Sequence, residues 1–209
     1  VAIPNMEAIS LINAIKDRIR IPLVADIHFD YRLALAAIDA GIDKIRINPG
    51  NIGDDDRVRQ VANACKSANV PIRIGVNAGS LEREILKKYK APTSHALVES
   101  AMNHVSLLER HDFHDIVISI KSSNVNTMVE SYRLLAKKCD YPLHLGVTEA
   151  GTERMGLIKS AIGIGSLLLD GIGETIRVSL TADPIKEIRA AKDILRSIGR
   201  YGGIEIISC

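Results

Sequence analysis

The sequence predicts an α/β fold of the TIM-type (β/α)8 barrel. Short runs rich in Val and Ile alternate with amphipathic stretches of about 12 to 18 residues, which is the rhythm of βα units that build a parallel sheet. Polar and charged residues recur at the carboxyl ends of these runs, where the strands of a barrel meet a ligand. With 209 residues, the chain has the size of one large domain.

The strand-like runs are separated by segments with helical periodicity. The runs cover 1–4, 22–28, 43–48, 71–77, 115–121, 142–148, 175–180 and 203–208. Pro22, Pro71 and Pro142 stand at strand starts, where proline removes no hydrogen bond from the ladder.

Helix starts are marked by side chains that accept hydrogen bonds from the free N–H groups of a first turn. These predicted N-caps are Asn5, Asp30, Asp54, Thr93 and Asp183. Pro184 suits a first helical turn, because the N–H that it lacks would have no partner there. The Gly-dense stretch 163–173 predicts a helix that ends in a glycine turn.

Composition excludes several classes of function. The 27 Lys and Arg against 25 Asp and Glu give a formal charge of +2, without the charge runs of nucleic-acid arms. Aromatic residues make up 3%, too few for a platform that stacks single-stranded nucleic acid. No apolar run reaches the roughly 18 residues of a membrane span, and no signal peptide is recognisable. We expect a cytoplasmic protein that binds neither nucleic acid nor membrane, with a small polar ligand.

Some reactive residue types receive no functional role. Cys65 and Cys139 fall in or at the end of helical patterns and are expected to be ordinary small apolar residues. The helix predicted around 94–111 carries or adjoins histidines that we expect to be solvated, namely His95, His104, His111 and His114. His144 lies inside a strand and could face the core or a site.

Polar residues two apart in a strand point to the same face, and several predicted strands carry such sets. The sets are Asp26 with His28, Arg46 with Asn48, Arg73 with Gly75 and Asn77, Ser119 with Lys121, and Arg177 with Ser179. Thr148 and Glu149 occupy the same place at the end of the run 142–148. Because both faces of a parallel sheet are normally buried, charges repeated on one face indicate a shared site.

A barrel would bring these strand ends to one mouth, and the charges there are mainly positive. Arg46, Arg73, Lys121 and Arg177 outnumber Asp26 and Glu149. Fixed cations suit a multiply charged anion, and the planar Arg fork suits phosphate oxygens. We therefore expect a phosphorylated ligand. For any single residue, the alternative is a structural salt bridge at the top of the barrel.

Longer motifs extend along the whole chain. They are VADIHFDYRLAL, RINPGNIG, IRIGVNAGSLE, SYRLLAK, PLHLGVTEAG, KSAIG and IRVSLTADP, in this order. Together they closely resemble the 4-hydroxy-3-methylbut-2-enyl diphosphate synthase family of the non-mevalonate (MEP) isoprenoid pathway. The resemblance implies a bacterial-type oxidoreductase with an N-terminal barrel and a smaller domain that holds a 4Fe-4S cluster on three Cys and one Glu.

Compared with that family, the chain is expected to be a barrel fragment. The resemblance implies that residues 1–200 form a partial TIM barrel that lacks its first strand. Residues 201–209 would begin the iron-sulfur domain, with Cys209 as the first metal ligand. The run 203–208 would then belong to that domain and would not be the eighth barrel strand.

The family reaction opens the ring of 2-C-methyl-D-erythritol 2,4-cyclodiphosphate, removes the C3 hydroxyl as water and adds two electrons, giving (E)-4-hydroxy-3-methylbut-2-enyl diphosphate. Ferredoxin or flavodoxin supplies the electrons. The resemblance also implies a head-to-tail homodimer of the full-length protein, in which the cluster domain of one subunit caps the barrel of the other. The fragment alone is expected to be inactive.

The resemblance assigns roles to the polar strand ends. Residues that hold the diphosphate are Arg46, Arg73, Lys121, Arg177 and Ser179, with hydrogen bonds added by Asn48 and Asn77. The catalytic candidates nearer the reacting carbons are Asp26, His28 and Glu149. Among them, Glu149 is the candidate for proton handling or for orienting the C3 hydroxyl.

Two other classes remain open from the residues themselves. One is a non-catalytic barrel that binds a phosphate ligand. The other is a cluster-free barrel enzyme, such as a phospho-sugar aldolase or a pterin-binding transferase, in which Lys121 could be a Schiff-base lysine.

Overall fold

The structure, a computed structural model of the chain, describes residues 1–148 and 151–202. Its strands are parallel, and their order in space follows their order in the chain. The paired strands are β1 (Val24–Asp26), β2 (Lys44–Ile47), β3 (Ile72–Asn77) and β4 (Ile116–Lys121), followed by the pair β5 (His144–Leu145) and β6 (Thr175–Ile176). Single parallel bridges join Ala2 to Asp26 and Ile118 to Leu143, so the N-terminal segment and β5 belong to the same series.

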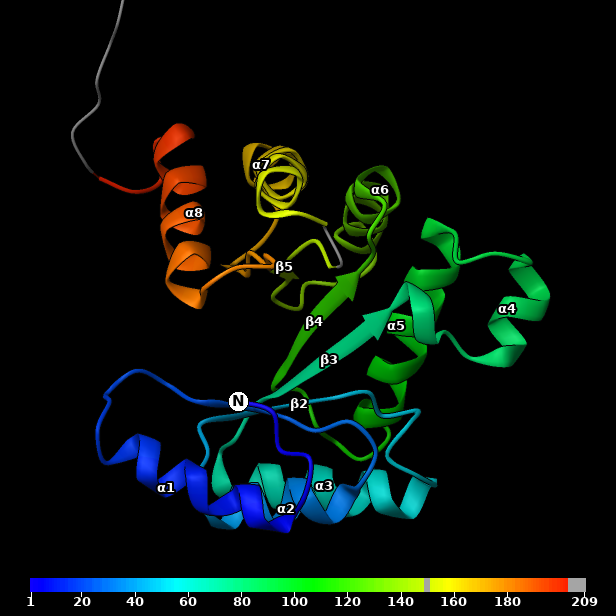
Figure 1. Cartoon of the computed structure of the whole chain (residues 1–209). Helices are drawn as coiled ribbons and strands as arrows, with labels where there is room; N and C mark the ends of the chain where they lie inside the picture. The colour runs from blue at the N-terminus through cyan, green and yellow to red at the C-terminus, as the bar shows by residue number, and fades with distance from the viewer. Residues whose placement is uncertain (149–150, 203–209) are drawn as a thin grey trace, which may run out of the picture.

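The helices form an arc around the strands (Figure 1). The arc runs through α1 (Ser10–Lys16), α2 (Tyr31–Asp39), α3 (Asp55–Ala68), α5 (Ser94–Glu109), α6 (Val125–Leu135), α7 (Glu153–Leu169) and α8 (Pro184–Ser197). Two short 3-10 turns, η1 (Met6–Ile9) and η2 (Ala78–Ser80), and a further helix, α4 (Arg83–Tyr89), complete the described elements. None of the helices in this part of the chain has the length and apolar content needed to cross a membrane.

The predicted barrel-type α/β fold is confirmed, although the barrel is open. Within the described residues, no ladder joins β6 to the segment around Ala2. The predicted strands 142–148 and 175–180 are correspondingly reduced to two paired residues each, β5 and β6. The predicted strand 203–208 lies outside the described residues.

Each predicted N-cap is confirmed by a hydrogen bond from its side chain to the first turn. Asn5 accepts from Ala8 N, Asp30 from Arg32 N, Asp54 from Arg57 N, Thr93 from Ala96 N and Asp183 from Ile185 N. Pro184 occupies the first turn of α8. The prediction for 163–173 is also confirmed, because α7 ends at Leu169 and Gly171 follows with a φ of 78°.

The core forms where the strands turn their apolar residues towards the helices. Ile45 and Ile47 of β2 and Ile72 and Ile74 of β3 are fully buried, and the polar residues alternate with them. Burying a side chain of this size contributes about 1.5 to 3 kcal/mol. This alternation leaves the opposite face of the sheet available for a site.

The histidine prediction for the helix at 94–111 is only partly right. His95 and His114 are exposed, as expected. His104 is 2% exposed, because it lies on the face of α5 that also buries Ala101, Val105 and Leu108. His111 is half-buried and lies 3.3 Å from the Asp55 carboxylate.

Candidate functional site

Strand register brings the predicted charges into neighbouring rows. Asp26 of β1 is opposite Arg46 of β2, and Arg46 is opposite Arg73 of β3. Two residues further along β3, Gly75 faces Ser119 of β4, and Asn77 then faces Lys121. In a parallel sheet, residues in register point to the same side. The polar sets on successive strands therefore share one face, as the sequence predicts.

Asp26 is the centre of an ionic group at the first strand ends. Its Oδ1 accepts a hydrogen bond of 2.8 Å from Nη1 of Arg46 and lies 3.6 Å from Nε2 of His28. Burial alone would raise the pKa of the Asp26 carboxyl, but the charge and hydrogen bond of Arg46 outweigh burial and lower it. Asp26 is therefore ionised and holds the Arg46 guanidinium in place.

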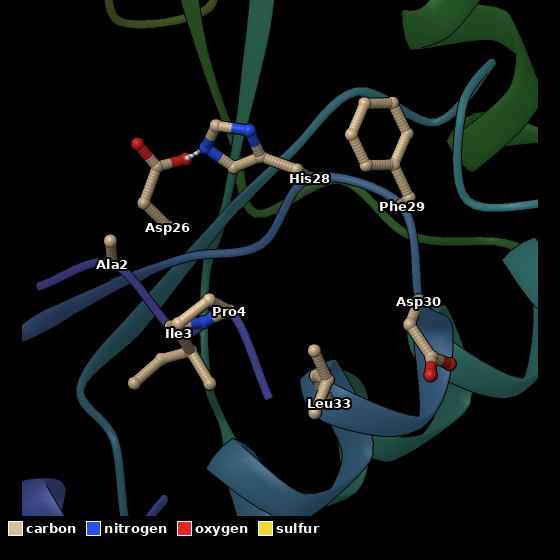
Figure 2. A pocket seen from close by; sticks show the side chains of 8 residues that line it. All are labelled: Ala2, Ile3, Pro4, Asp26, His28, Phe29, Asp30 and Leu33. Atoms are coloured by element: carbon tan, nitrogen blue, oxygen red, sulfur yellow. Dashed lines mark ion pairs between the residues drawn. The ribbon is translucent and has the colours of Figure 1, made fainter. Parts of the chain in front are cut away.

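Asp26 and His28 line a pocket at the N-terminal edge of the sheet, with a volume of about 310 Å³. Figure 2 shows the two side chains directed towards each other, while Ile3, Pro4 and Leu33 form an apolar wall. Phe29 borders the pocket and is 71% exposed. The hydrogen bond from Arg46 to Asp26 connects this pocket to the next strand.

The Arg46 side chain lies across β3 at a position where β3 has no side chain. A β-carbon on Gly75 would come within 2.2 Å of Arg46 Nε and 2.6 Å of its Cζ. Arg46 Nη2 is 3.5 Å from the Gly75 carbonyl oxygen. Its Nε is buried and has no hydrogen-bond partner among the described residues, which leaves a donor for a ligand.

Further along the sheet, Lys121 and Arg177 line a second, smaller cavity with Thr148 and Ser179, of about 40 Å³. Burial lowers the pKa of the Lys121 ammonium to about 8, and the charges of Arg177, Arg46 and Arg73 add to this effect. Only Asp26 acts in the opposite direction among these groups. The neighbouring cations thus disfavour the charged form of Lys121.

Arg73 experiences the same field. Burial has the largest effect and lowers the pKa of its guanidinium. The negative charge of Asp26 raises this pKa, and the positive charges of Arg46 and Arg177 lower it further. A group of cations with too few acids is stabilised by an anion that neutralises them. The electrostatics of the described strand ends therefore favour a ligand with more than one negative charge.

The two predicted asparagines lie at strand ends: Asn48 directly follows β2, and Asn77 is the last residue of β3. Asn48 is buried, and its Oδ1 accepts from Gly50 N at 3.1 Å. Asn77 is half-buried, and its Oδ1 accepts from Gly79 N at 3.3 Å. With the oxygens used in these turns, the NH2 group of each amide is the part that can donate to an anion. Glu149 and Cys209, also predicted as site residues, lie outside the described residues.

His144 was left open by the sequence, and the structure places it inside the barrel. Its Nδ1 lies 2.8 Å from Thr175 Oγ1, and the residue is 7% exposed. Burial, with the charges of Arg73, Lys121 and Arg177, lowers the imidazole pKa to about 3. His144 is therefore neutral and adds no charge to the cation group. His144 and Thr148 are four residues apart in the same predicted strand and therefore point to the same face. This spacing is the sequence signal for the inward orientation of His144.

Gly146 is a site position that the sequence analysis missed. A β-carbon there would lie 2.8 Å from the Arg177 carbonyl oxygen, so glycine lets β5 and the chain after β6 approach closely beside the Lys121 cavity. The PLHLGVTEAG motif contains this glycine. Its packing partner, Arg177, is 31 residues away in the chain, so a local sequence pattern does not indicate the contact.

The described residues do not suit a 4Fe-4S cluster. No group of three His, Cys, Asp or Glu is placed to bind a metal in this part of the chain. Cys65 is fully buried, which raises the pKa of its thiol to about 12. Burial also raises the pKa of Cys139 above its ordinary value. Neither cysteine is the ready thiolate that iron requires.

Comparison with known proteins agrees with the geometry. The chain is 63% identical over 209 residues to the 4-hydroxy-3-methylbut-2-en-1-yl diphosphate synthase (flavodoxin) of Clostridium perfringens, covering 100% of this chain and 60% of that protein. The protein of the same name from Fusobacterium nucleatum is 62% identical over 208 residues, covering 99% of this chain and 59% of that protein. The chain thus spans about three fifths of the length of these relatives.

Solved structures show the same fold at low sequence identity. A dihydropteroate synthase from Stenotrophomonas maltophilia superposes with a TM-score of 0.60 at 16% identity, covering 91% of this chain and 74% of that one. A type I 3-dehydroquinate dehydratase from Clostridium difficile superposes with a TM-score of 0.59 at 15% identity, covering 92% and 77%.

The family is established by the sequence of the barrel itself. The family model described as the GcpE TIM-barrel domain matches residues 1–192, which include every described strand and every predicted site residue except Cys209. The chain belongs to the GcpE TIM-barrel domain family.

Proposed function

We propose that this chain is the substrate-binding barrel of a 4-hydroxy-3-methylbut-2-enyl diphosphate synthase and that its strand ends bind 2-C-methyl-D-erythritol 2,4-cyclodiphosphate. The observation that carries the proposal is the cation group of Arg46, Arg73, Lys121 and Arg177, which perturb one another electrostatically. A diphosphate supplies the negative charge that this group requires.

The residue roles follow from the chemistry of each position. Arg46, Arg73, Lys121, Arg177 and Ser179 would bind the diphosphate oxygens, and the amides of Asn48 and Asn77 would donate further hydrogen bonds. Asp26 orients Arg46, and Asp26 and His28 are proposed to lie near the reacting carbons of the ligand. Glu149 is proposed to handle the proton or to orient the C3 hydroxyl.

The complete reaction needs electrons that side chains cannot supply, and the family provides them through a 4Fe-4S cluster. We propose that residues 1–200 form the barrel and that residues 201–209, with Cys209, lead into the cluster domain. A flavodoxin, named for the relatives, or a ferredoxin would be the electron donor. A head-to-tail homodimer would bring the cluster domain of one subunit to the barrel of the other.

The test is the substitution Arg73→Leu in a protein of the relatives' full length. We expect binding of the cyclic diphosphate to weaken by roughly 2 to 5 kcal/mol, the range for truncating a buried charged contact. Isothermal titration would measure the affinity, and circular dichroism would check the fold. Arg59→Leu on the exposed surface of α3 is the control, because among the described residues the ion-pair partner of Arg59 is Asp56 of the same helix.

Two outcomes would overturn the proposal. One is unchanged affinity in a folded Arg73→Leu protein, which would make Arg73 a structural residue. The other is a wild-type protein of the relatives' full length that binds the cyclic diphosphate but does not convert it with a supplied reductant, which would favour a non-catalytic phosphate-binding barrel.

A further inference from the structure

A polar cluster lies between α5 and the segment that precedes α4. It consists of Glu82, which immediately precedes α4, and of Ser100 and His104 on α5. Ser100 Oγ donates to the Glu82 carboxylate at 2.8 Å, and His104 Nε2 lies 2.6 Å from Glu82 Oε1. Ser100 and His104 are four residues apart, so one face of α5 presents both to the same carboxylate.

Glu82 is held as a carboxylate in this setting. Burial alone would raise the pKa of its carboxyl, but hydrogen bonds from His104, the backbone and Ser100 outweigh burial and lower it to about 2. His104 is 2% exposed and Ser100 is 1% exposed. An ionised group fixed by several buried donors has little freedom to move.

This cluster touches the loop that carries Asn48. Gly50 lies so close to His104 that a β-carbon at Gly50 would be 2.7 Å from His104 Nε2 and 3.6 Å from Glu82 Oε1. Gly50 N donates to Asn48 Oδ1, and Asn51 N donates to the Asn48 carbonyl oxygen at 2.9 Å. The turn that orients the Asn48 amide therefore rests directly on the imidazole.

The cluster also restrains the loop after β3. Glu82 follows Asn77 by five residues, and the chain between them contains η2, which Asn77 caps through Gly79 N. α5 itself packs against β3 and β4. One face of α5 thus contacts the loops after both β2 and β3. Asn48 lies in the first of these loops, and Asn77 directly precedes the second.

We propose that Glu82 and His104 are positioning residues, which fix the turn at Asn48 so that its amide points to the ligand at the strand ends. The ligand role of Asn48 rests on the proposed function, while the contact of His104 with the turn does not. A hydrogen-bonded polar pair is by itself weak evidence for a stabilising role. The contact with Gly50 instead connects the pair to the site.

The first test is a double-mutant cycle in a protein of the relatives' full length. His104→Leu should lower kcat/KM by about tenfold, a size typical of coupled neighbours. Adding it to Asn48→Ala should cause no further loss beyond about twofold, because the group that it positions is already absent. His104→Gln should retain most of the activity, since its amide can donate to Glu82 in place of Nε2. His95→Leu, at an exposed position of the same helix, is the control.

The second test needs no substrate. Amide hydrogen exchange of Gly50 and Asn51, which both donate to Asn48, should accelerate in His104→Leu and in Glu82→Gln but not in His95→Leu. If His104→Leu does not fold, Glu82→Gln and Ser100→Ala replace it in both tests. The inference would be overturned if the loss of kcat/KM in the double variant equalled the product of the losses in His104→Leu and Asn48→Ala. Unchanged exchange at Gly50 and Asn51 would also overturn it. A wild-type protein that neither binds nor converts the cyclic diphosphate would refute the proposed function, and the exchange data would still decide whether the cluster positions the turn.

Discussion

At the scale of single residues, the site depends on small side chains as much as on charged ones. Arg46 reaches across the sheet only because residue 75 is glycine, and its guanidinium is then held by Asp26. Gly75 has no positive φ, so its role is to leave space and not to permit an unusual backbone conformation.

Replacing Gly75 with Ala should therefore affect binding more than folding. The new β-carbon would displace the flexible end of Arg46, and the ligand would lose a charge-assisted hydrogen bond of about 1.5 to 3 kcal/mol. Titration with inorganic diphosphate should show an affinity at least about tenfold lower. Gly165→Ala is the control, because nothing lies within 4 Å of its new β-carbon. Equal affinities for the two variants would contradict this account of Gly75.

Lys121 makes binding depend on pH. Its ammonium has a pKa of about 8 instead of 10.5, so the lysine is charged below pH 8 and loses its proton above it. A bound anion favours the charged form, and affinity for diphosphate should fall as the pH rises past about 8. Lys121→Met should remove this fall. Lys44→Met is a necessary comparison, because burial and Arg73 also lower the pKa of Lys44.

The lowered pKa of Lys121 also affects stability. Affinity for diphosphate should fall with rising pH, whereas stability should increase. Between about pH 8 and 10.5, the unfolded lysine binds a proton that the folded one has lost. The free energy of unfolding of the ligand-free protein should therefore rise with pH across this window. Urea unfolding at several pH values would measure it, and a slope that persists in Lys121→Met would assign the effect to another group.

At the scale of elements, one tyrosine joins two strands whose own pairing is short. β4 and β5 are connected by the single bridge between Ile118 and Leu143. The buried hydroxyl of Tyr132 on α6 accepts from Ile120 N at 2.9 Å and donates to the His144 carbonyl oxygen at 2.5 Å. The helix thus supplies hydrogen bonds that the ladder does not.

Tyr132→Phe should lower the free energy of unfolding by about 1 to 3 kcal/mol, because it leaves buried backbone groups without this partner. Tyr141→Phe is the matched control, since the Tyr141 hydroxyl bonds to Glu109 at an exposed position. Urea unfolding of both variants would measure the difference. Equal losses would show that the Tyr132 hydroxyl does not hold β4 to β5.

At the scale of the whole molecule, our proposal separates substrate binding by this chain from electron transfer by a cluster domain. A protein of these 209 residues contains three cysteines, and Cys65 and Cys139 are unsuited to iron. We expect no turnover after anaerobic reconstitution with iron and sulfide and assay with a reduced viologen dye, because a four-iron cluster needs four ligands. Turnover by this protein would disprove the separation of binding and redox chemistry, and turnover that depends on the relatives' remaining length would support it.

The barrel formed by the described residues is open. β6 and the segment at Ala2 have no partner on their outer sides among the described residues. The two pockets lie at these ends of the series, one beside Ala2 and the other beside Arg177. The single mouth that the sequence predicts would require these two ends to meet, as they do in a closed barrel.

The sequence by itself determined the elements and their polarity. The runs that form β1 to β4, the N-caps at Asp30 and Asp54, and the faces of Arg46 and Lys121 could be predicted, because alternation and capping depend on residues close along the chain. The length of the last two strands could not, since β5 and β6 are shorter than the predicted runs. The same reasoning misplaced His104, since the burial of a helix face depends on what packs against it. It also could not decide the orientation of His144.

Only the tertiary structure decided how distant residues share space. Arg46 lies over Gly75, 29 residues away, and His104 meets both Glu82 and Gly50 across three different segments. Burial and neighbouring charges then set the pKa values of Lys121 and His144. These properties arise from packing and from the summed field of the folded chain, and no local pattern in the sequence contains either of them.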